Sequence, residues 1–259
     1  MRIALAQIQS GTEPTANLGL VEEYTLRAAD QGARLVLFPE ATMCRFGVPL
    51  APIAEPLDGP WATGVRAIAE RAGIVVVAGM FVPAEEDRAG RVTNTLIATG
   101  PGVDAHYDKI HLYDAFGFAE SDTVAPGTEL LVTEVSGIAV GFAICYDVRF
   151  PALFTTLADR GAQVICVPAS WGAGPTKIEQ WEVLTRARAI ENQAFLVAPA
   201  QVGQAFPGRE SHGHARVIDP WGRTLAERPA GSGIVYAQLN FAELDRIRKE
   251  LPALGHRKL

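Results

Sequence analysis

Short apolar runs and longer amphipathic stretches alternate along most of the chain. Short runs rich in Val and Ile are typical of buried strands, whereas apolar residues spaced three and four apart indicate helices. This pattern predicts strands over Arg2–Gln9, Arg34–Phe38, Ile74–Phe81, Val92–Ala98, Val103–Tyr107, Leu130–Val135, Gly137 to Cys145, Val164–Val167, Phe195–Ala200, Ala215–Ile218, Thr224–Ala226 and Ile234–Leu239.

The amphipathic stretches predict five helices, and polar or glycine-rich stretches separate them from the strands. Asp58-Gly59-Pro60 is a good helix start, because aspartate caps a helix and proline fits its first turn. The helices are expected over Asn17–Gln31, from Pro60 to about Ala72, and over Pro151–Arg160, Ile178–Asn192 and Phe241–Leu251. An exposed hairpin loop over Pro83–Gly90, a segment without clear periodicity over Asp108–Gly127, a turn at Asp219–Gly222 and a mobile tail over Gly255–Leu259 complete the prediction.

Alternating helices and strands, together with hairpins in the middle and at the end, predict an α/β chain with mixed sheets. No composition shift, linker or low-complexity segment marks a boundary within residues 1–259. We therefore expect a single domain, whose length is sufficient for a sizeable core.

Composition and charge exclude several function classes. The net charge of −6 favours neither a nucleic-acid partner nor an anionic membrane surface. No apolar run reaches the roughly 18 residues that a membrane span needs. The N-terminal strand is short and alternating, unlike a secretory signal. These features predict a cytoplasmic protein.

Cys145 stands out among the three cysteines, which form neither a disulfide framework nor a zinc-ligand pair. It ends an apolar strand, and Pro151 then opens a helix. A thiol near a helix N-terminus is biased toward thiolate, although a small buried hydrophobe fits the position equally well. Cys166 lies in a strand run and is expected in the core, while Cys44, in a loop, is ambiguous.

Chemistry at Cys145 requires a base and a positive partner. Glu40 directly follows an apolar strand, and partial desolvation would make its carboxylate a better base. On its own, however, it fits a solvated loop glutamate better. Taken alone, Lys109 fits a surface lysine, and Glu120 fits a residue of an acidic loop. None of the five histidines has a recognisable cysteine-protease context.

Five sequence blocks together resemble the nitrilase superfamily of carbon–nitrogen hydrolases. Three are like its signature blocks, one resembles the helix after its active-site loop, and one resembles its late turn. In family order they are Phe38-Pro39-Glu40, Tyr107–Leu112, Ile144–Pro151, Arg186–Gln193 and Asp219–Gly222. Cys145-Tyr146-Asp147 and the following Arg149-Phe150-Pro151 resemble the branch that contains ω-amidase and deaminated-glutathione amidase.

The resemblance implies a four-layer αββα sandwich with two mixed β-sheets. It also implies a homodimer or a higher homo-oligomer, in which protomers pack helix against helix. By the same resemblance Cys145 is the nucleophile, Glu40 the general base and Lys109 the cationic partner. Glu120 would orient Lys109 or assist proton transfer, and the backbone N–H of Tyr146 would stabilise the oxyanion. No metal or cofactor is implied.

The substrate is less tightly defined by the sequence. A guanidinium at Arg149 would hold a substrate carboxylate, or would instead pair with Asp147. Trp171 and Phe46 are expected to line the pocket or to pack their loops. Lys177 fits a solvated loop lysine better than a pocket residue. Ala215 stands where the family commonly has a serine, which would remove a hydroxyl near the pocket edge.

These residues predict a cysteine-dependent amidase that cleaves a small, carboxylate-bearing primary amide through a thioester. Nitrile hydrolysis and N-carbamoyl hydrolysis by the same triad are alternatives. A catalytically idle scaffold on the same fold is a third possibility from a different class. It is disfavoured because idle members are expected to lose a triad residue, and here the triad is intact.

Overall fold

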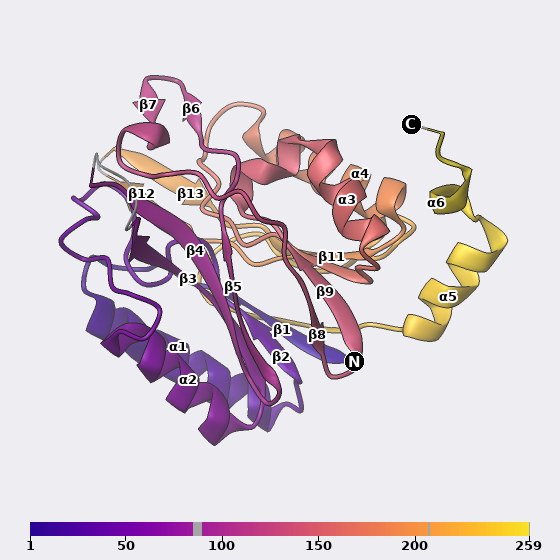
Figure 1. Cartoon of the computed structure of the whole chain (residues 1–259), viewed down its shortest axis with the longest axis horizontal. Helices are drawn as coiled ribbons and strands as arrows, with labels where there is room; N and C mark the ends of the chain where they lie inside the picture. The colour runs from indigo at the N-terminus through magenta and orange to yellow at the C-terminus, as the bar shows by residue number, and fades with distance from the viewer. Residues whose placement is uncertain (85–89, 207, 259) are drawn as a thin grey trace.

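Two six-stranded sheets form the centre of the molecule in the computed structural model, which describes residues 1–84, 90–206 and 208–258 (Figure 1). The first sheet has the order β16-β1-β2-β3-β4-β5, formed by Gly233–Gln238, Arg2–Gln7, Leu35–Leu37, Val75–Pro83, Val92–Gly100 and Val103–Asp108. The second has the order β15-β14-β11-β10-β9-β8, formed by Thr224–Arg228, Ala215–Ile218, Phe195–Ala198, Val164–Cys166, Ile138–Phe142 and Val132–Val135.

The two sheets share one pattern of strand directions, although the sequence has no repeat of fixed period. In the first sheet β1, β2 and β3 are parallel. Strand β16 pairs antiparallel with β1, β4 with β3, and β5 with β4. In the second sheet β9, β10 and β11 are parallel, and β8, β14 and β15 are added antiparallel. Both sheets are therefore mixed, as predicted.

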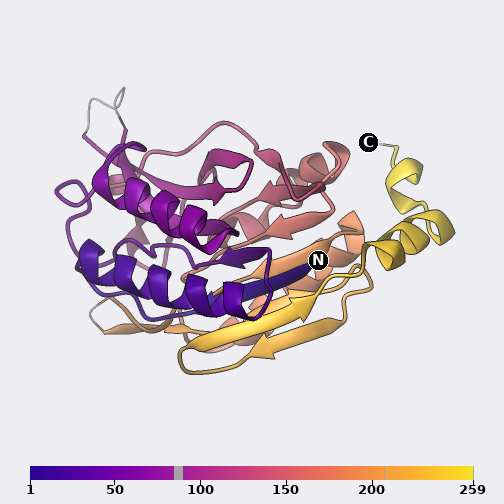
Figure 2. The ribbon, with the colours of Figure 1, turned by 90° about the horizontal axis from the view of Figure 1, so that it is seen from below.

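Helices cover the outer faces of the sheets and complete the αββα layers. Figure 2 shows α1 (Pro14–Asp30) and α2 (Pro60–Ala72) side by side over the first sheet. The second sheet carries α3 (Pro151–Asp159) and α4 (Lys177–Asn192). One buried cluster joins the inner faces of both sheets, including Leu5, Leu37, Phe142 and Ile165. Each such side chain contributes roughly 1.5–3 kcal/mol by leaving water, so the seam between the sheets is the main core.

Some boundaries differ from the prediction. Helix α1 begins at Pro14 instead of Asn17, because proline fits the first helical position. Asn17 lies within this helix, and its side chain binds two loops: its Oδ1 accepts from the Gly11 N–H of the preceding loop at 2.8 Å, and its Nδ2 donates to Met43 O, which follows β2, at 2.9 Å. Strand β1 ends at Gln7 and β11 at Ala198, each earlier than expected.

The sequence pattern missed several short elements. They are the hairpin β6–β7 (Asp114–Ala115, Phe118–Ala119), the 3-10 helices η1 (Glu120–Asp122) and η2 (Cys145–Arg149), the hairpin β12–β13 (Val202–Phe206, Arg209–His212), and α6 (Ala253–His256), which follows α5 (Phe241–Glu250). The hairpins are polar or glycine-containing and show no alternation that would mark a strand.

Two other expectations are tested only in part. Part of the tail expected to be mobile is helical in α6, and Leu259 lies outside the described residues. The hairpin loop expected over Pro83–Gly90 falls largely on residues 85–89, which also lie outside them, although Pro83 and Val92 do pair. No helix that the structure describes has the length and apolar character to cross a membrane.

The strand ends define one functional edge of the two sheets. Glu40 follows the end of β2, Cys145 follows β9, Ser170 follows β10 and Lys109 follows β5. In open α/β sheets, ligands bind at the carboxyl ends of the strands. Segments far apart in the sequence thus deliver polar side chains to the same edge.

Candidate active site

Cys145 is the first residue of η2, and its backbone is strained. Its φ of 45° lies in the left-handed region, which a non-glycine residue adopts only at a cost. Its N–H donates to Pro168 O at 3.0 Å, and its side chain is almost fully buried. The next amide, that of Tyr146, belongs to the first turn of η2, where N–H groups have no acceptor within the helix. This N–H is thus available to an acceptor outside the helix.

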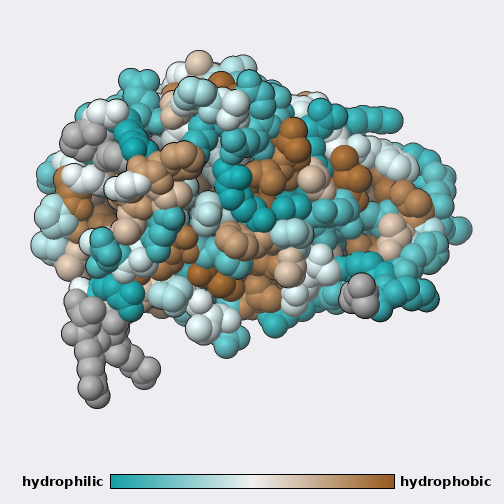
Figure 3. Space-filling view, turned by 90° about the horizontal axis from the view of Figure 1, so that it is seen from above, coloured by the Kyte–Doolittle hydropathy of each residue, from teal (hydrophilic) through white to brown (hydrophobic). Residues whose placement is uncertain are grey.

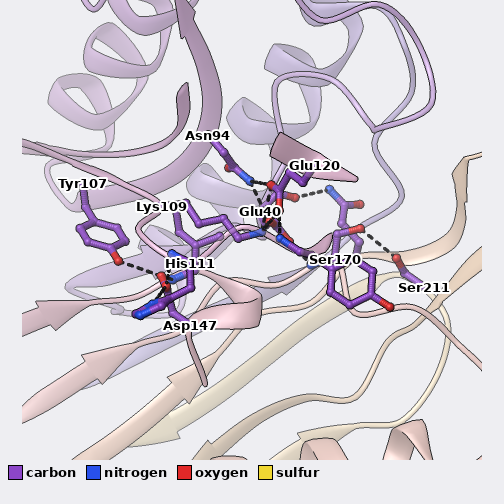
Figure 4. A network of polar contacts seen from close by, with 12 residues as sticks. Glu40, Asn94, Tyr107, Lys109, His111, Glu120, Asp147, Ser170 and Ser211 are labelled. Atoms are coloured by element: carbon purple, nitrogen blue, oxygen red, sulfur yellow. Dashed lines mark hydrogen bonds and ion pairs between the residues drawn. The ribbon is translucent and has the colours of Figure 1, made fainter. Parts of the chain in front are cut away.

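The carboxylate of Asp147 connects the turn at Cys145 to the segment around Lys109. Its Oδ2 accepts from the Ile144 N–H at 2.8 Å and from the Tyr107 hydroxyl at 2.7 Å (Figure 4). Its Oδ1 accepts from the His111 N–H at 2.9 Å and lies 2.7 Å from His111 Nδ1. Tyr107 and His111 flank Lys109 in the sequence. One buried carboxylate therefore fixes the backbone on both sides of the site.

Glu40 is 1% exposed and its two carboxylate oxygens have different partners. Oε1 accepts from Lys109 Nζ at 2.9 Å and from Asn94 Nδ2 at 2.8 Å. Oε2 accepts from the Ser170 N–H at 2.8 Å. The solvated loop glutamate that the sequence favours for Glu40 alone is therefore wrong.

The backbone around Glu40 depends on close packing. A Cβ at Gly79 on β3 would lie 2.7 Å from Ala41 N and 2.9 Å from Pro39 O, so only glycine lets the loop pass. Gln201 Nε2 donates to the carbonyl of Glu40 at 3.1 Å. Together these contacts hold the carboxylate at the strand edge.

Lys109 lies between two carboxylates, and Glu120 holds it most closely. Its Nζ donates to Glu120 Oε1 at 3.0 Å and to Oε2 at 2.8 Å, and both side chains are 2% exposed. Burial on its own lowers the pKa of Lys109, but the charges of Glu120 and Glu40 outweigh burial and keep that pKa well above its ordinary value. Lys109 is therefore a permanent ammonium, not the surface lysine that its local sequence suggests.

The thiol of Cys145 is protonated in the free protein. Burial raises the pKa of Cys145 most strongly, and the negative charge of Glu40 and a hydrogen bond to it raise it further. Lys109 acts in the opposite direction but does not prevail. The expectation that a helix terminus would favour thiolate is therefore wrong for this state. Attack by sulfur from this state requires a group that removes the thiol proton.

One cavity gathers every residue that the sequence singled out for the site. Its walls are formed by Glu40, Phe46, Lys109, Tyr113, Phe118, Glu120, Cys145, Tyr146, Arg149, Ser170, Trp171, Gly172, Ala173, Lys177, Ala205, Arg209 and Glu210. Phe46 and Trp171 both line it and pack: Phe46 meets Phe81 edge-on at 5.5 Å, and Trp171 meets Trp181 at 5.1 Å.

Two cations of the cavity wall are held by aromatic rings. The Arg149 guanidinium lies 4.9 Å from the Trp171 ring centroid and donates to Gln180 Oε1 at 2.6 Å. The alternative ion pair with Asp147 is absent among the residues described. Lys177 Nζ lies 4.7 Å from the Phe116 ring and 5.7 Å from that of Trp171.

Lys177 is therefore part of the cavity, and the solvated loop lysine favoured by the sequence is wrong. Its pKa is lowered, first by burial and then by the charge of Arg149. The two side chains place positive charge on one wall of the cavity, where an anionic group of a ligand would be favoured.

Two polar residues that bind the carboxylate of Glu40 escaped the sequence analysis. Asn94 is a buried asparagine near the start of β4, and the rarity of asparagine in strands was the available signal. Ser170 follows a strand end, and its hydroxyl lies 3.0 Å from that of Ser211. Ala215, by contrast, is buried in the core and does not line the cavity, so its missing hydroxyl does not alter the pocket edge.

The other two cysteines have no place in this site. Cys44 is fully buried in a separate apolar cluster with Leu50 and Phe81. Burial raises the pKa of Cys44 to about 11, so it is not the oxidisable second thiol that its sequence position allowed. Cys166 is in the core, as predicted, and burial raises its pKa as well.

The best group of potential metal ligands in the described ranges lies outside the cavity. Ligand atoms of Glu182, His214 and Glu227 lie within 4.8 Å of one another. However, Nη2 of Arg216 lies 3.7 Å from Glu227 and 3.9 Å from Glu182. A guanidinium at that distance already neutralises the carboxylates and would repel a cation, so we interpret the group as an ion-pair network.

Comparison with known proteins agrees with this geometry. The family model described as carbon–nitrogen hydrolase matches residues 2–249. A hydrolase of Mycobacterium tuberculosis is 58% identical over 256 residues, which cover 95% of this chain and 89% of that protein. Deaminated glutathione amidase of Yersinia enterocolitica is 34% identical, with 99% and 92% covered.

A solved structure has a related fold and an active-site cysteine. It is a variant of the amidase from Nesterenkonia sp. in which acrylamide has added to the active-site cysteine. It is 29% identical to this chain, with a TM-score of 0.81, and 97% of this chain and 98% of that one are covered. The chain therefore belongs to the carbon–nitrogen hydrolase family, within the nitrilase superfamily, and is an enzyme that hydrolyses non-peptide carbon–nitrogen bonds.

Proposed function

We propose that this enzyme is a cysteine-dependent amidase that converts a small, carboxylate-bearing primary amide to the acid and ammonia through a thioester. The observation that carries the proposal is the convergence of Glu40, Lys109 and Cys145 in one buried cavity. A protonated thiol, a neighbouring carboxylate and a permanent ammonium are the groups that acyl transfer to sulfur requires.

In the first half of the reaction Glu40 accepts the thiol proton while the sulfur attacks the amide carbonyl. The S–H bond breaks, its electron pair forms the S–C bond, and the carbonyl π pair moves to oxygen. Lys109 and the N–H of Tyr146 are the donors available to the resulting oxyanion. Removing one such donor typically costs about 10²–10³-fold in rate.

In the second half protonated Glu40 gives its proton to the leaving nitrogen, and ammonia departs as the thioester forms. Water then attacks the thioester carbonyl while Glu40 takes one of its protons. Collapse of this second tetrahedral species releases the acid and returns the proton from Glu40 to sulfur. Both carboxylate oxygens of Glu120 accept from Lys109 Nζ, and Glu120 thereby keeps Lys109 in place throughout the reaction.

The carboxylate on the substrate is proposed from the cavity wall. Arg149 and Lys177 lie against aromatic rings at the cavity, and neither forms an ion pair with a carboxylate among the described residues. A guanidinium can bind a carboxylate through two parallel hydrogen bonds. A relative named deaminated glutathione amidase and a solved structure named as an amidase from Nesterenkonia sp. support an amide as the reacting group.

Ammonia release from a panel of compounds tests the proposal. The panel contains 2-oxoglutaramate, 2-oxosuccinamate, glutaramate, deaminated glutathione, N-carbamoyl amino acids and simple nitriles. Deaminated glutathione is a secondary amide and releases an amine in place of ammonia, so its acid product is measured. The matched control pair is Cys145→Ala, which must abolish turnover, and Cys44→Ala, which must not. Turnover of nitriles or carbamoyl compounds alone would replace the amidase proposal. If no compound yields a product that depends on Cys145, the alternative of a catalytically idle scaffold is favoured.

The proposed assembly is a homodimer that packs through the α3–α4 layer. On α4, Val183 is 66% and Ile190 is 48% exposed, and Leu225 of β15 is 44% exposed. Figure 3 looks onto the side on which α3 and α4 are drawn, and hydrophobic residues form brown patches over its middle. Sedimentation of the wild type and of Val183→Glu tests this, because the charged variant should shift toward monomer.

Two further proposals concern organisation and location. We treat residues 1–259 as a single domain, because one buried cluster takes side chains from both sheets. We also place the enzyme in the cytoplasm, where a reducing environment keeps a catalytic thiol such as Cys145 reduced. Two-state unfolding and cell fractionation test these two points.

A further inference from the structure

The side chain of Asn94 joins the two carboxylates of the site. It is fully buried on β4, and its Nδ2 donates to Glu40 Oε1 at 2.8 Å and to Glu120 Oε1 at 3.1 Å (Figure 4). Its backbone carbonyl accepts from the Lys109 N–H at 2.9 Å. One residue thus contacts Glu40, Lys109 and Glu120, the three members of the buried ion-pair cluster.

The chemistry of the neighbours fixes the orientation of this amide. Exchanging Oδ1 and Nδ2 would place the side-chain carbonyl oxygen of Asn94 against two carboxylate oxygens. All three oxygens are acceptors, so no hydrogen bond could form between them. In the observed orientation Oδ1 has no partner among the described residues. The position of Asn94 is therefore set by the two carboxylates, and no hydrogen bond to Oδ1 competes with them.

The hydrogen bonds of Lys109 show why a second donor is needed. An ammonium has three N–H groups, and Nζ has three acceptors: Glu40 Oε1, Glu120 Oε1 and Glu120 Oε2. Both carboxylates thus hold the ammonium before substrate binds. When Lys109 turns an N–H toward an oxyanion, its hydrogen bond to one of these carboxylate oxygens lengthens, while the side chain that carries this oxygen stays buried.

Asn94 donates to two of these three acceptors, one on each carboxylate: Glu40 Oε1 and Glu120 Oε1. Whichever Oε1 atom the ammonium leaves, Asn94 still supplies it with a hydrogen bond. Without that bond an acceptor on a buried side chain would lose its remaining partner among the described residues, which is costly. An amide also adds no charge, whereas a second cation or a third carboxylate would upset the balance around Lys109.

We propose that Asn94 is a positioning residue that acts as a standby donor: it holds the Oε1 atoms of Glu40 and Glu120 when Lys109 turns an N–H toward the oxyanion. This inference rests on the proposed function. It also makes Glu40 Oε2 the proton acceptor, because Oε1 is occupied by Asn94 and Lys109, whereas Oε2 has the Ser170 N–H as its partner.

The test compares turnover with a reaction that forms no oxyanion. Kinetics are measured for Asn94→Ala and Asn94→Ser on the best amide of the panel, and alkylation of Cys145 by iodoacetamide is followed by mass spectrometry. The matched control is Asn192→Ala, since Asn192 is also buried, donates through Nδ2 and has an unpartnered Oδ1, but lies at the end of α4. All variants are compared by thermal unfolding.

The standby role predicts that kcat falls roughly 10- to 100-fold in both Asn94 variants, the range expected for losing a hydrogen bond to a charged group. KM and the plateau rate of alkylation stay within about three-fold, because neither depends on an oxyanion. Asn192→Ala leaves all three quantities near wild type. Parallel losses of kcat and alkylation, an unchanged kcat, or failure of both Asn94 variants to fold would each overturn the inference.

Glu40→Gln separates this inference from the proposed function. If it abolishes turnover and slows alkylation while the Asn94 variants behave like wild type, the base is confirmed and only the standby role fails. If Glu40→Gln leaves turnover intact, the proposed base is wrong, and the standby role fails with it. An absence of turnover in the wild type on every compound of the panel would count against the proposed function.

Discussion

The ammonium of Lys109 and the carboxylate of Glu40 lie 2.9 Å apart, with side chains 2% and 1% exposed. A second carboxylate, Glu120, lies 2.8 Å from the same ammonium. The single cation thus neutralises two buried anions at once. Its removal must therefore affect folding as well as catalysis.

Lys109→Met should lower the free energy of unfolding by about 3–5 kcal/mol, because it leaves two buried carboxylates without a counter-charge. Urea unfolding at neutral pH measures this. Lys249→Met, which removes an exposed lysine of α5, serves as the control and should change stability little. Adding Glu120→Gln to Lys109→Met should restore part of the loss. Equal stabilities of the Lys109 and Lys249 variants would contradict the ion-pair description.

Arg149→Ala should raise KM for acidic amides roughly 10- to 100-fold, the loss expected for a charge-assisted contact. Neutral amides of similar size should be affected much less, because they lack the group that the guanidinium would bind. Steady-state kinetics on an acidic amide and a neutral one of matched length check this. Equal losses on both amides would show that Arg149 supports the cavity through Trp171 and Gln180 and does not bind the substrate.

The free enzyme should contain no thiolate near neutral pH. The pKa values of Cys44, Cys145 and Cys166 are all raised, in each case chiefly by burial. Ultraviolet absorbance of thiolates, followed from about pH 5 to about pH 8, should therefore remain flat. A titration step in this range that disappears in Cys145→Ser would show a preformed thiolate, and Glu40 would then not be needed to activate the sulfur.

His212 should make the protein less stable in mild acid. Burial, and then the neighbouring His214, lower the pKa of His212 from its ordinary 6.5 to about 4. Between these values the unfolded chain binds more protons than the folded one, so the free energy of unfolding rises with pH across this window and falls as pH drops through it.

Urea unfolding at several pH values between about 4 and about 6.5 measures this slope. His212→Asn should flatten it, whereas His256→Asn, at an exposed position of α6, should leave it unchanged. If the slope is the same in wild type and His212→Asn, His212 does not titrate as its burial implies.

The sequence identified the residues that end strands but could not show what they meet. Glu40 and Cys145 each follow an apolar run, and such positions lie at the edge where ligands bind. Their long-range partners have no local signal: Ser170, whose N–H binds Glu40, is 130 residues away. Family resemblance supplied the connection that periodicity lacked.

Other features were missed because local composition conceals them. Asn94 lies inside a strand of Val, Thr and Leu, and nothing in that run indicates that its amide faces two carboxylates. The hairpin β12–β13 is glycine-containing and polar, and it contributes Arg209 to the cavity wall. Lys177 resembles a loop lysine until aromatic rings from other segments surround it.

In the proposed mechanism Cys145 forms a thioester with the acyl group of the substrate, and Glu40 is the base. Mass spectrometry of enzyme quenched with acid during turnover of the best amide tests it most directly. We expect the peptide containing Cys145 to gain the mass of the acyl group minus one hydrogen, and we expect this gain to disappear in Glu40→Gln. Turnover by Cys145→Ala at the wild-type rate, with no acyl group on any peptide, would contradict it.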